Sequence, residues 1–324
     1  MARRMIIKEQ DYARQMKLVV EPYLAKRRQE AFIKRESDRS VYYARYQADE
    51  AKGTILISHG FTETADKYFE LAYYFLKSGF HVYIPEHLGH GRSTRLVEDL
   101  SLVHTENYRA YTDDLLAMAS AARNTYPGLP LYLYGHSMGG GIAACAAAED
   151  PDAFAKLVLS SPMIRPQTGR LPWTAVKAVL SVKIRLGKGT EYLSGHHPYD
   201  GSEVFADSAA TSEARFEYYQ KKKRSAPLFQ MSGASNKWLA ESAHMEHYLM
   251  TKGWKNIRIP TLFFQAEQDT FVCPGTQEQF VRLIHHHSPG LIKLVRVPDA
   301  KHEIYNASND ILTPYITKIL AFLQ

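Results

Sequence analysis

The feature that most constrains the fold of this chain is a regular alternation of short apolar runs with helical stretches from residue 54 onward. Runs that are apolar along their whole length are typical of strands buried on both faces of a sheet. Parallel strands need long crossover connections, and the helical stretches supply them. We therefore predict an α/β fold with a mostly parallel, doubly wound sheet. The predicted strands are 54–58, 81–85, 131–134, 156–160, 261–265 and 291–297, and the predicted helices are 64–78, 107–126, 138–149, 276–287 and 311–323.

The chain before residue 54 follows a different pattern. Apolar side chains recur at helical spacing within residues 10–34, and Pro22 predicts a break or kink in that helix. Two extended runs, 31–35 and 41–47, are joined by the polar turn 36–39. Such a pair of runs indicates a β-hairpin.

Residues 163–250 interrupt the alternation. They are rich in helical patterns and aromatic side chains and contain no convincing run for a buried strand. An insertion between strands of a parallel sheet emerges at the sheet edge where such folds bind ligands, so we interpret it as a helical cap. The predicted organisation is a helical lead-in over 1–30, an α/β core formed by 31–162 and 251–324, and the cap over 163–250.

Composition and charge exclude several classes of protein. With 324 residues, 45% of them hydrophobic and 23% charged, the chain has the composition of an ordinary globular protein. The formal net charge of +6 arises within residues 1–46, which hold 12 Lys and Arg against 6 Asp and Glu. A nucleic-acid binder usually has a basic face on its folded body, so we expect no nucleic-acid partner. Two interpretations of the basic lead-in stay open, namely contact with an anionic membrane surface or an ordinary solvated segment.

No targeting or membrane-spanning segment is predicted. The N-terminus is charged and lacks the apolar core of a secretory signal. No stretch approaches the roughly 18 uninterrupted apolar residues that a membrane span needs. We therefore expect a cytoplasmic protein, peripheral to the inner face of the membrane if its basic lead-in binds lipid.

The strongest local motif is Gly135-His136-Ser137-Met138-Gly139, which has the form G-x-S-x-G. It directly follows an apolar strand and directly opens a helix rich in Ala and Gly. This context is typical of a nucleophile elbow, in which the serine lies on a sharp strand-to-helix turn with its hydroxyl exposed. Gly135 and Gly139 remove side chains that would collide around the turn. Ser137 is therefore the candidate nucleophile.

A serine nucleophile needs a base, and the base needs an acid that orients it. In this architecture the order along the chain is Ser, then Asp or Glu, then His, with each partner just after a late strand. Asp269 and His302 meet both requirements, and we predict them as the acid and the base. Glu267 is the rival acid, and Glu303 is a weaker one.

An acyl-transfer site also needs two donors for the developing oxyanion. The first is the backbone N–H of Met138, the residue after the nucleophile. The second is expected from the turn after the first parallel strand, and we assign it to the backbone N–H of Phe61. In the same turn we expect His59 to brace the loop rather than to catalyse.

No metal site or cofactor is predicted. Cys145 and Cys273 are far apart and have no partner at metal-ligand spacing. The run 285–287 consists of three histidines at the end of a predicted helix, and no carboxylate follows them at ligand spacing. The chemistry expected at Ser137 needs neither a metal ion nor an organic cofactor.

The segments that carry these residues resemble the serine hydrolases of the α/β-hydrolase fold, specifically the bacterial lysophospholipase and monoacylglycerol lipase group. The resemblance is carried by HGFTETADKYFELAYYFLKSGFHVYIPEHLGHGRS, GHSMGGG, QAEQDTFV and DAKHEIYN, and it runs from about residue 23 to the C-terminus. It implies the α/β-hydrolase fold with an inserted cap and a small lipid-like ester as substrate. Two departures stand out. The first is that Glu86 and Leu88 stand where relatives often have Asp and Arg. The second is that HGFTE differs from the HG-x-G-E form of typical monoacylglycerol lipases and is more similar to the lysophospholipases.

Three hypotheses for function follow. The first is a serine carboxylesterase of lipid metabolism that removes a single acyl chain from a lysophospholipid or a monoacylglycerol. The second keeps this machinery but takes short or aromatic acyl esters, or acts as an aminopeptidase of the same fold, for which the cap offers several carboxylates. The third is a non-enzymatic scaffold, which the filled catalytic positions argue against. The sequence predicts no oligomeric state.

Overall fold

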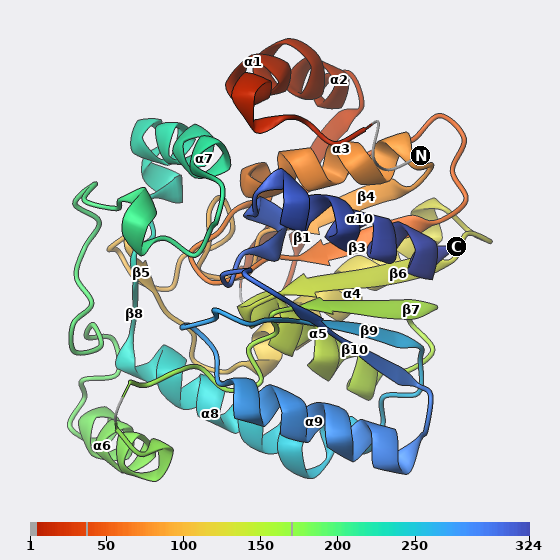
Figure 1. Cartoon of the computed structure of the whole chain (residues 1–324). Coiled ribbons are helices and arrows are strands. Elements are labelled where there is room, and N and C mark those ends of the chain that lie inside the picture. The colour runs from red at the N-terminus through yellow and green to blue at the C-terminus, as the bar shows by residue number, and fades with distance from the viewer. Residues whose placement is uncertain (1–4, 37, 170) are drawn as a thin grey trace.

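The fold is that of a computed structural model of the whole chain, which describes residues 5–36, 38–169 and 171–324 (Figure 1). Eight strands form one sheet. Six of them are mutually parallel, namely β4, β3, β6, β7, β9 and β10, and the hairpin β1–β2 extends the sheet by pairing antiparallel with β4. The predicted fold class is confirmed, and the hairpin is present as well. In order across the sheet the strands are β1 (Arg28–Lys34), β2 (Ser40–Tyr46), β4 (His81–Pro85), β3 (Thr54–Ser58), β6 (Leu131–His136), β7 (Lys156–Ser160), β9 (Thr261–Ala266) and β10 (Ile292–Val297).

Helices cover both faces of the sheet, and an apolar core lies on each side (Figure 1). One face is covered by α3 (Phe69–Lys77) and α10 (Asn309–Leu323). The other is covered by α4 (Arg109–Thr125), α5 (Met138–Glu149) and α9 (Pro274–His287). Every residue of α5 from Met138 to Ala148 is buried, because its glycines and alanines let the helix pack closely against neighbouring elements.

The helical part of the lead-in is shorter than predicted. It consists of η2 (Glu9–Asp11), α1 (Tyr12–Gln15), the π-helical stretch η3 (Met16–Val20) and α2 (Glu21–Ala25). The prediction of helix as far as residue 34 is wrong, because residues 28–34 pair with β2 as an edge strand. This pairing outweighs local helical preference, as tertiary contacts often do. The π-helical stretch lies just before Pro22, whose missing N–H interrupts the regular helical ladder.

The segment predicted as a cap contains three helices and a short strand. They are α6 (Trp173–Arg185), α7 (Glu213–Ser225), α8 (Asn236–Thr251) and β8 (Gly233–Ala234). β8 pairs with β5 (Leu102–Val103), so the segment is not free of strand. Two residues are too few for a periodic signal, which is why the sequence did not reveal β8. α7 lies beside α1 at one end of the molecule, and α6 lies beside α8 at the other (Figure 1).

The remaining short elements are single 3-10 turns. None of the helices in the described ranges is both long enough and apolar enough to span a bilayer. The 3-10 turns are η4 (Ala65–Tyr68), η5 (Phe205–Asp207), η6 (Pro227–Phe229), η7 (Gly253–Lys255) and η8 (Ile304–Asn306).

Candidate active site

Ser137 lies on the turn between β6 and α5 with φ at 52° and ψ at −122°. A non-glycine residue with this backbone conformation is strained and persists only where its surroundings hold it. Here the Ser137 N–H donates to the carbonyl of Ser160 at 3.1 Å, and the Ser137 carbonyl accepts from the N–H of Met163 at 2.7 Å. The β6 to β7 pairing and the chain that follows β7 therefore hold the elbow in its strained form.

The two motif glycines are needed because the backbone around the elbow is crowded. A Cβ on Gly135 would lie 2.6 Å from the carbonyl oxygen of Gly139 and 2.7 Å from Cβ of Ala143. A Cβ on Gly139 would collide with the carbonyl oxygens of Ser58 and His59. Only hydrogen fits at either position, so the first turn of α5 can lie directly against the loop after β3.

The structure brings together three of the predicted residues from distant parts of the chain. Nε2 of His302 lies 2.7 Å from Oγ of Ser137, and Nδ1 of His302 lies 2.7 Å from Oδ2 of Asp269. Asp269 follows β9 and His302 follows β10. Because parallel strands end at the same edge of the sheet, these residues meet beside the elbow. The serine hydroxyl, the imidazole and the carboxylate form one continuous hydrogen-bonded chain.

Asp269 is held as a carboxylate. Its burial would raise its pKa, but His302 and the N–H groups of Phe271 and Val272 outweigh that effect and lower the pKa. Both N–H groups donate to Oδ1, at 2.9 and 3.2 Å, which leaves Oδ2 for the imidazole. This arrangement fixes the orientation of the carboxylate toward His302.

Neither rival acid takes this place. Glu267 is exposed. Oε1 of Glu303 lies 2.6 Å from Nζ of Lys67, and its Oε2 accepts from the Asn306 amide at 2.9 Å. Of the three candidate acids, Asp269 is the one hydrogen-bonded to the His302 ring.

The predicted oxyanion donors lie at the start of α5 and in the turn after β3. Within the described part of the chain, neither the N–H of Met138 nor that of Phe61 has a hydrogen-bond acceptor. Met138 is the first residue of α5, where N–H groups have no partner within the helix. Both groups are therefore available to a ligand atom.

His59 lies in the loop beneath Phe61. Its Nε2 accepts from the His87 N–H at 2.8 Å, so the ring proton is on Nδ1, which donates to the carbonyl of Gly60 at 2.7 Å. Burial lowers the pKa of His59 to about 4, so the ring is neutral. A neutral ring with both nitrogens occupied braces the loop, as expected.

Sequence reasoning missed a buried carboxylate behind this loop. Oε2 of Glu63 accepts from the N–H of Gly60 at 2.7 Å, and its Oε1 accepts from the hydroxyl of Tyr305 at 2.6 Å. Tyr68 also donates to Oε2, and Nζ of Lys67 lies 3.0 Å from Oε1. The sequence around Glu63 does not reveal this role, because the partner Tyr305 is 242 residues away along the chain.

His136 connects that carboxylate to the base. Its ring packs against the His302 ring with centroids 4.9 Å apart and the ring planes tilted by 51°, and its Nε2 lies 3.8 Å from Oε1 of Glu63. Burial lowers the pKa of His136 to about 4, although the Glu63 charge opposes the shift. The ring is therefore neutral and supports the His302 imidazole from one side.

Ser137 opens onto a cleft of about 640 Å³ that the core and the predicted cap line together. One part of its wall is apolar, and another carries paired charges and amides. The apolar part includes Phe61, Met163, Leu193, Phe216, Trp238, Leu239 and Val272, and the polar part includes Lys67, Glu203, Gln220, Lys223, Glu303 and Asn306. A ligand with an apolar portion and a polar portion matches such a wall.

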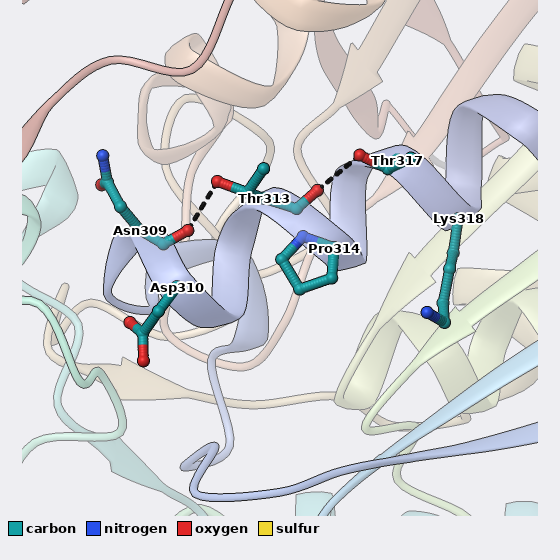
Figure 2. A pocket seen from close by; sticks show the side chains of 6 residues that line it. All are labelled: Asn309, Asp310, Thr313, Pro314, Thr317 and Lys318. Carbon is teal, nitrogen blue, oxygen red and sulfur yellow. Dashed lines mark hydrogen bonds between the residues drawn. The ribbon is translucent and has the colours of Figure 1, made fainter. Parts of the chain in front are cut away.

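A second hollow, of about 610 Å³, lies on the outer face of α10. Figure 2 shows its lining, in which Thr313 and Thr317 donate to the carbonyls of Asn309 and Thr313 one helical turn earlier. These are local bonds around Pro314, which cannot donate a helical hydrogen bond. The lining contains none of the predicted catalytic residues, so the cleft at Ser137 is the candidate active site. Across the described ranges, no group of His, Cys, Asp and Glu side chains is arranged to hold a metal ion.

Comparison with known proteins agrees with this geometry. The serine aminopeptidase S33 family of hydrolases matches residues 49–309. The chain belongs to this family. The predictions of a serine hydrolase and of a resemblance to the lysophospholipase and monoacylglycerol lipase group are thereby confirmed.

Individual relatives of this S33 chain carry two kinds of name. The monoacylglycerol lipase of Mycolicibacterium smegmatis is 31% identical over 168 residues, which are 52% of this chain and 58% of that protein. The lysophospholipase L2 of Escherichia coli K12 is 27% identical over 261 residues, which are 80% of this chain and 76% of that protein. The matched part thus spans little more than half of the mycobacterial lipase.

Solved structures place the S33 chain in the same fold. A soluble variant of the monoglyceride lipase of Saccharomyces cerevisiae superposes with a TM-score of 0.74 at 17% identity, over 92% of this chain and 95% of that one. At this identity the likeness establishes the fold alone. It agrees with the parallel sheet and flanking helices described above.

Proposed function

We propose that this protein is a carboxylic-ester hydrolase that removes a single long acyl chain from a lysophospholipid or a monoacylglycerol. The observation that carries the proposal is the hydrogen-bonded chain Ser137–His302–Asp269, which opens onto a cleft with an apolar wall. The names of the two relatives support the same class of substrate. No metal or organic cofactor takes part.

In the proposed mechanism, Oγ of Ser137 attacks the ester carbonyl while Nε2 of His302 takes its proton. Asp269 stays ionised and stabilises the imidazolium through Nδ1. The N–H groups of Phe61 and Met138 bind the oxyanion of the tetrahedral intermediate. His302 then protonates the departing alcohol, and a water activated by the same base releases the fatty acid.

Gly135, His136 and Gly139 shape the elbow that presents Ser137. We keep the boundaries proposed from the sequence, with a lead-in over 1–30, a core over 31–162 and 251–324, and a cap over 163–250. The participation of α7 and of residues 202–209 in the cleft wall supports the assignment of the cap. Its apolar residues would hold the acyl chain, because burial of methylene groups is the main source of affinity for such ligands.

The test is hydrolysis of a substrate panel by the purified protein. The panel contains monooleoylglycerol, lysophosphatidylcholine, p-nitrophenyl butyrate and an aminoacyl amide. We expect long-chain substrates to give the highest kcat/KM and Ser137→Ala to lower kcat by about a million-fold. Preference for the short ester or the amide would instead favour the alternatives, which are an esterase for short or aromatic acyl groups and an aminopeptidase.

Two finer predictions accompany this proposal. They are a cytoplasmic location and contact between the basic lead-in and an anionic membrane surface. Part of that charge is paired within the molecule, since Arg27 lies 2.9 Å from Asp49. The exposed Lys17 and Lys26 would make the contact with lipid.

A further inference from the structure

The cap helix α7 has two faces with different tasks. Its cleft-facing residues are Phe216, Tyr219, Gln220 and Lys223. Its other face carries Arg215, whose side chain is fully buried. α7 has a strongly polar sequence, so apolar packing alone cannot explain how it is held in place.

Arg215 uses all five of its N–H donors. Its Nε and Nη2 each donate to a carboxylate oxygen of Glu70 on α3, both at 2.9 Å. Nη1 donates to Oγ of Ser212 at 3.3 Å and to Oδ1 of Asn309 at 3.0 Å. Nη2 also donates to the carbonyl of Ile7 at 3.1 Å. A guanidinium has five donors in a rigid fork, so every one is satisfied and the side chain has a single orientation.

The lead-in closes this arrangement from outside. Oε1 of Glu9 accepts from Oγ of Ser212 at 2.6 Å, and Oε2 accepts from the N–H of Asn309 at 3.0 Å. The Asn309 amide donates to the carbonyl of Ile7 at 3.0 Å. Figure 2 shows Asn309 at the start of α10, and Figure 1 shows α7 next to α1. The lead-in, α3, α7 and α10 are thus joined at one point.

Aromatic contacts reinforce this junction. The guanidinium carbon of Arg215 lies 5.0 Å from the centroid of the Tyr12 ring. Tyr12 in turn packs edge-on against Tyr218 of α7 with centroids 5.6 Å apart. A cation over an aromatic face is attracted to it, and the attraction increases when water is excluded.

We propose that Arg215 is a positioning residue for substrate binding, which fixes the α7 wall of the cleft by tying it to α3, α10 and the lead-in. The inference rests on the proposed function, because it assigns the α7 wall to the long substrate. Small substrates reach Ser137 without needing that wall. Arg215 therefore acts on the preference for long substrates and leaves the reacting groups unchanged.

The experiment compares kcat/KM for monooleoylglycerol and for p-nitrophenyl acetate in the wild type and in Arg215→Met. A displaced wall of about 1 Å can cost up to a hundredfold, so we expect about a tenfold loss on the long substrate, mainly through KM. The short ester should stay within about twofold of the wild type, because Ser137, His302 and Asp269 are not disturbed.

A second variant guards against misfolding, because Arg215→Met leaves the buried Glu70 without its cation and costs stability. Glu9→Ala removes the lead-in carboxylate and keeps the Arg215–Glu70 pair. We expect it to lower kcat/KM on the long substrate by about threefold with the short ester unchanged. The matched control is Arg224→Ala on the same helix, since Arg224 is half-exposed and pairs with Glu217 of α7 itself.

Two outcomes would overturn the inference. One is an equal loss of kcat/KM on both substrates in Glu9→Ala and Arg215→Met, and the other is wild-type kcat/KM on both substrates in both variants. Failure of the proposed function is distinguishable, because the wild type itself would then show no preference for the long substrate. If the wild type prefers the long substrate and both variants keep that preference, the role of Arg215 is refuted and the proposed function stands.

Discussion

α5 begins directly after Ser137 and α7 lines the cleft, but the two helices are held in place in different ways. α5 is built of Gly and Ala, is buried along nearly its whole length and lies directly against the loop after β3. α7 is rich in charged residues and is tied by Arg215 to Glu70 and to the lead-in. The half of the site that reacts thus depends on close packing of backbone, and the half proposed to bind substrate depends on a few ionic bonds. We expect most substitutions in the reacting half to cause a large loss of activity or stability. Substitutions in the binding half should lower activity gradually.

The largest effect should come from Asp269→Asn. The amide oxygen can still accept from Phe271 and Val272, but the amide nitrogen would face Nδ1 of His302 and impose the wrong tautomer. We expect kcat to fall by about ten-thousandfold on long and short esters alike, with thermal stability near that of the wild type. The control is Glu267→Gln, which should keep full activity because Glu267 is exposed. A loss of kcat confined to long substrates would contradict the assignment of Asp269 to the reacting half of the site.

Gly139→Ala tests the packing of the reacting half. The new methyl group would meet the carbonyl oxygens of Ser58 and His59, which belong to backbone and cannot move aside. We expect a loss of about 3 kcal/mol in the free energy of unfolding, measured by urea denaturation. Gly275→Ala in the first turn of α9 is the matched control, since nothing lies within 4 Å of its added methyl group. Equal stability of the two variants would contradict this account of α5.

A smaller effect should appear as the pH is lowered. The ordinary histidine pKa is 6.5, and burial lowers that of His136 to about 4. Between these values the unfolded chain binds a proton that folded His136 does not, so the stability present at pH 7 is lost as the pH falls below 6.5. Near pH 5 the loss for one such group is on the order of 2 kcal/mol.

Thermal melts between pH 7 and pH 5 would measure this loss. His136→Gln should reduce the slope of Tm against pH, and part of the slope should remain because burial also lowers the pKa of His59 to about 4. His285→Gln, at an exposed site on α9, should leave it as in the wild type. Equal slopes in the wild type and in His136→Gln would show that His136 is not a buried neutral ring.

Much of the fold could be predicted because its elements are encoded by local patterns. All six parallel strands of the main sheet were anticipated within two residues at each end, since each is a short run of mostly apolar residues. The elbow was equally readable, because strand, turn and helix follow one another over a few residues. The lead-in was misjudged where β1 begins, since an edge strand with a mostly exposed surface carries a weak pattern.

The supporting residues of the site could not be predicted in the same way. Glu63 lies only three residues from Gly60, but Tyr305 reaches it from the far end of the chain. Nothing in the residues around Glu63 indicates that a tyrosine hydroxyl will meet it. Such contacts depend on how the loops after different strands converge at one edge of the sheet.

The sequence by itself determined the α/β fold, the position of Ser137 on its turn, and Asp269 and His302 as candidates after their strands. The reason is that strands, turns and helices are specified by residues close together along the chain. The tertiary structure alone decided that Glu63 supports the loop of Phe61 and that Arg215 joins α7 to the rest of the molecule. The Arg215 partners Glu70 and Ile7 are 145 and 208 residues away in sequence, and no local pattern records a contact over such a separation.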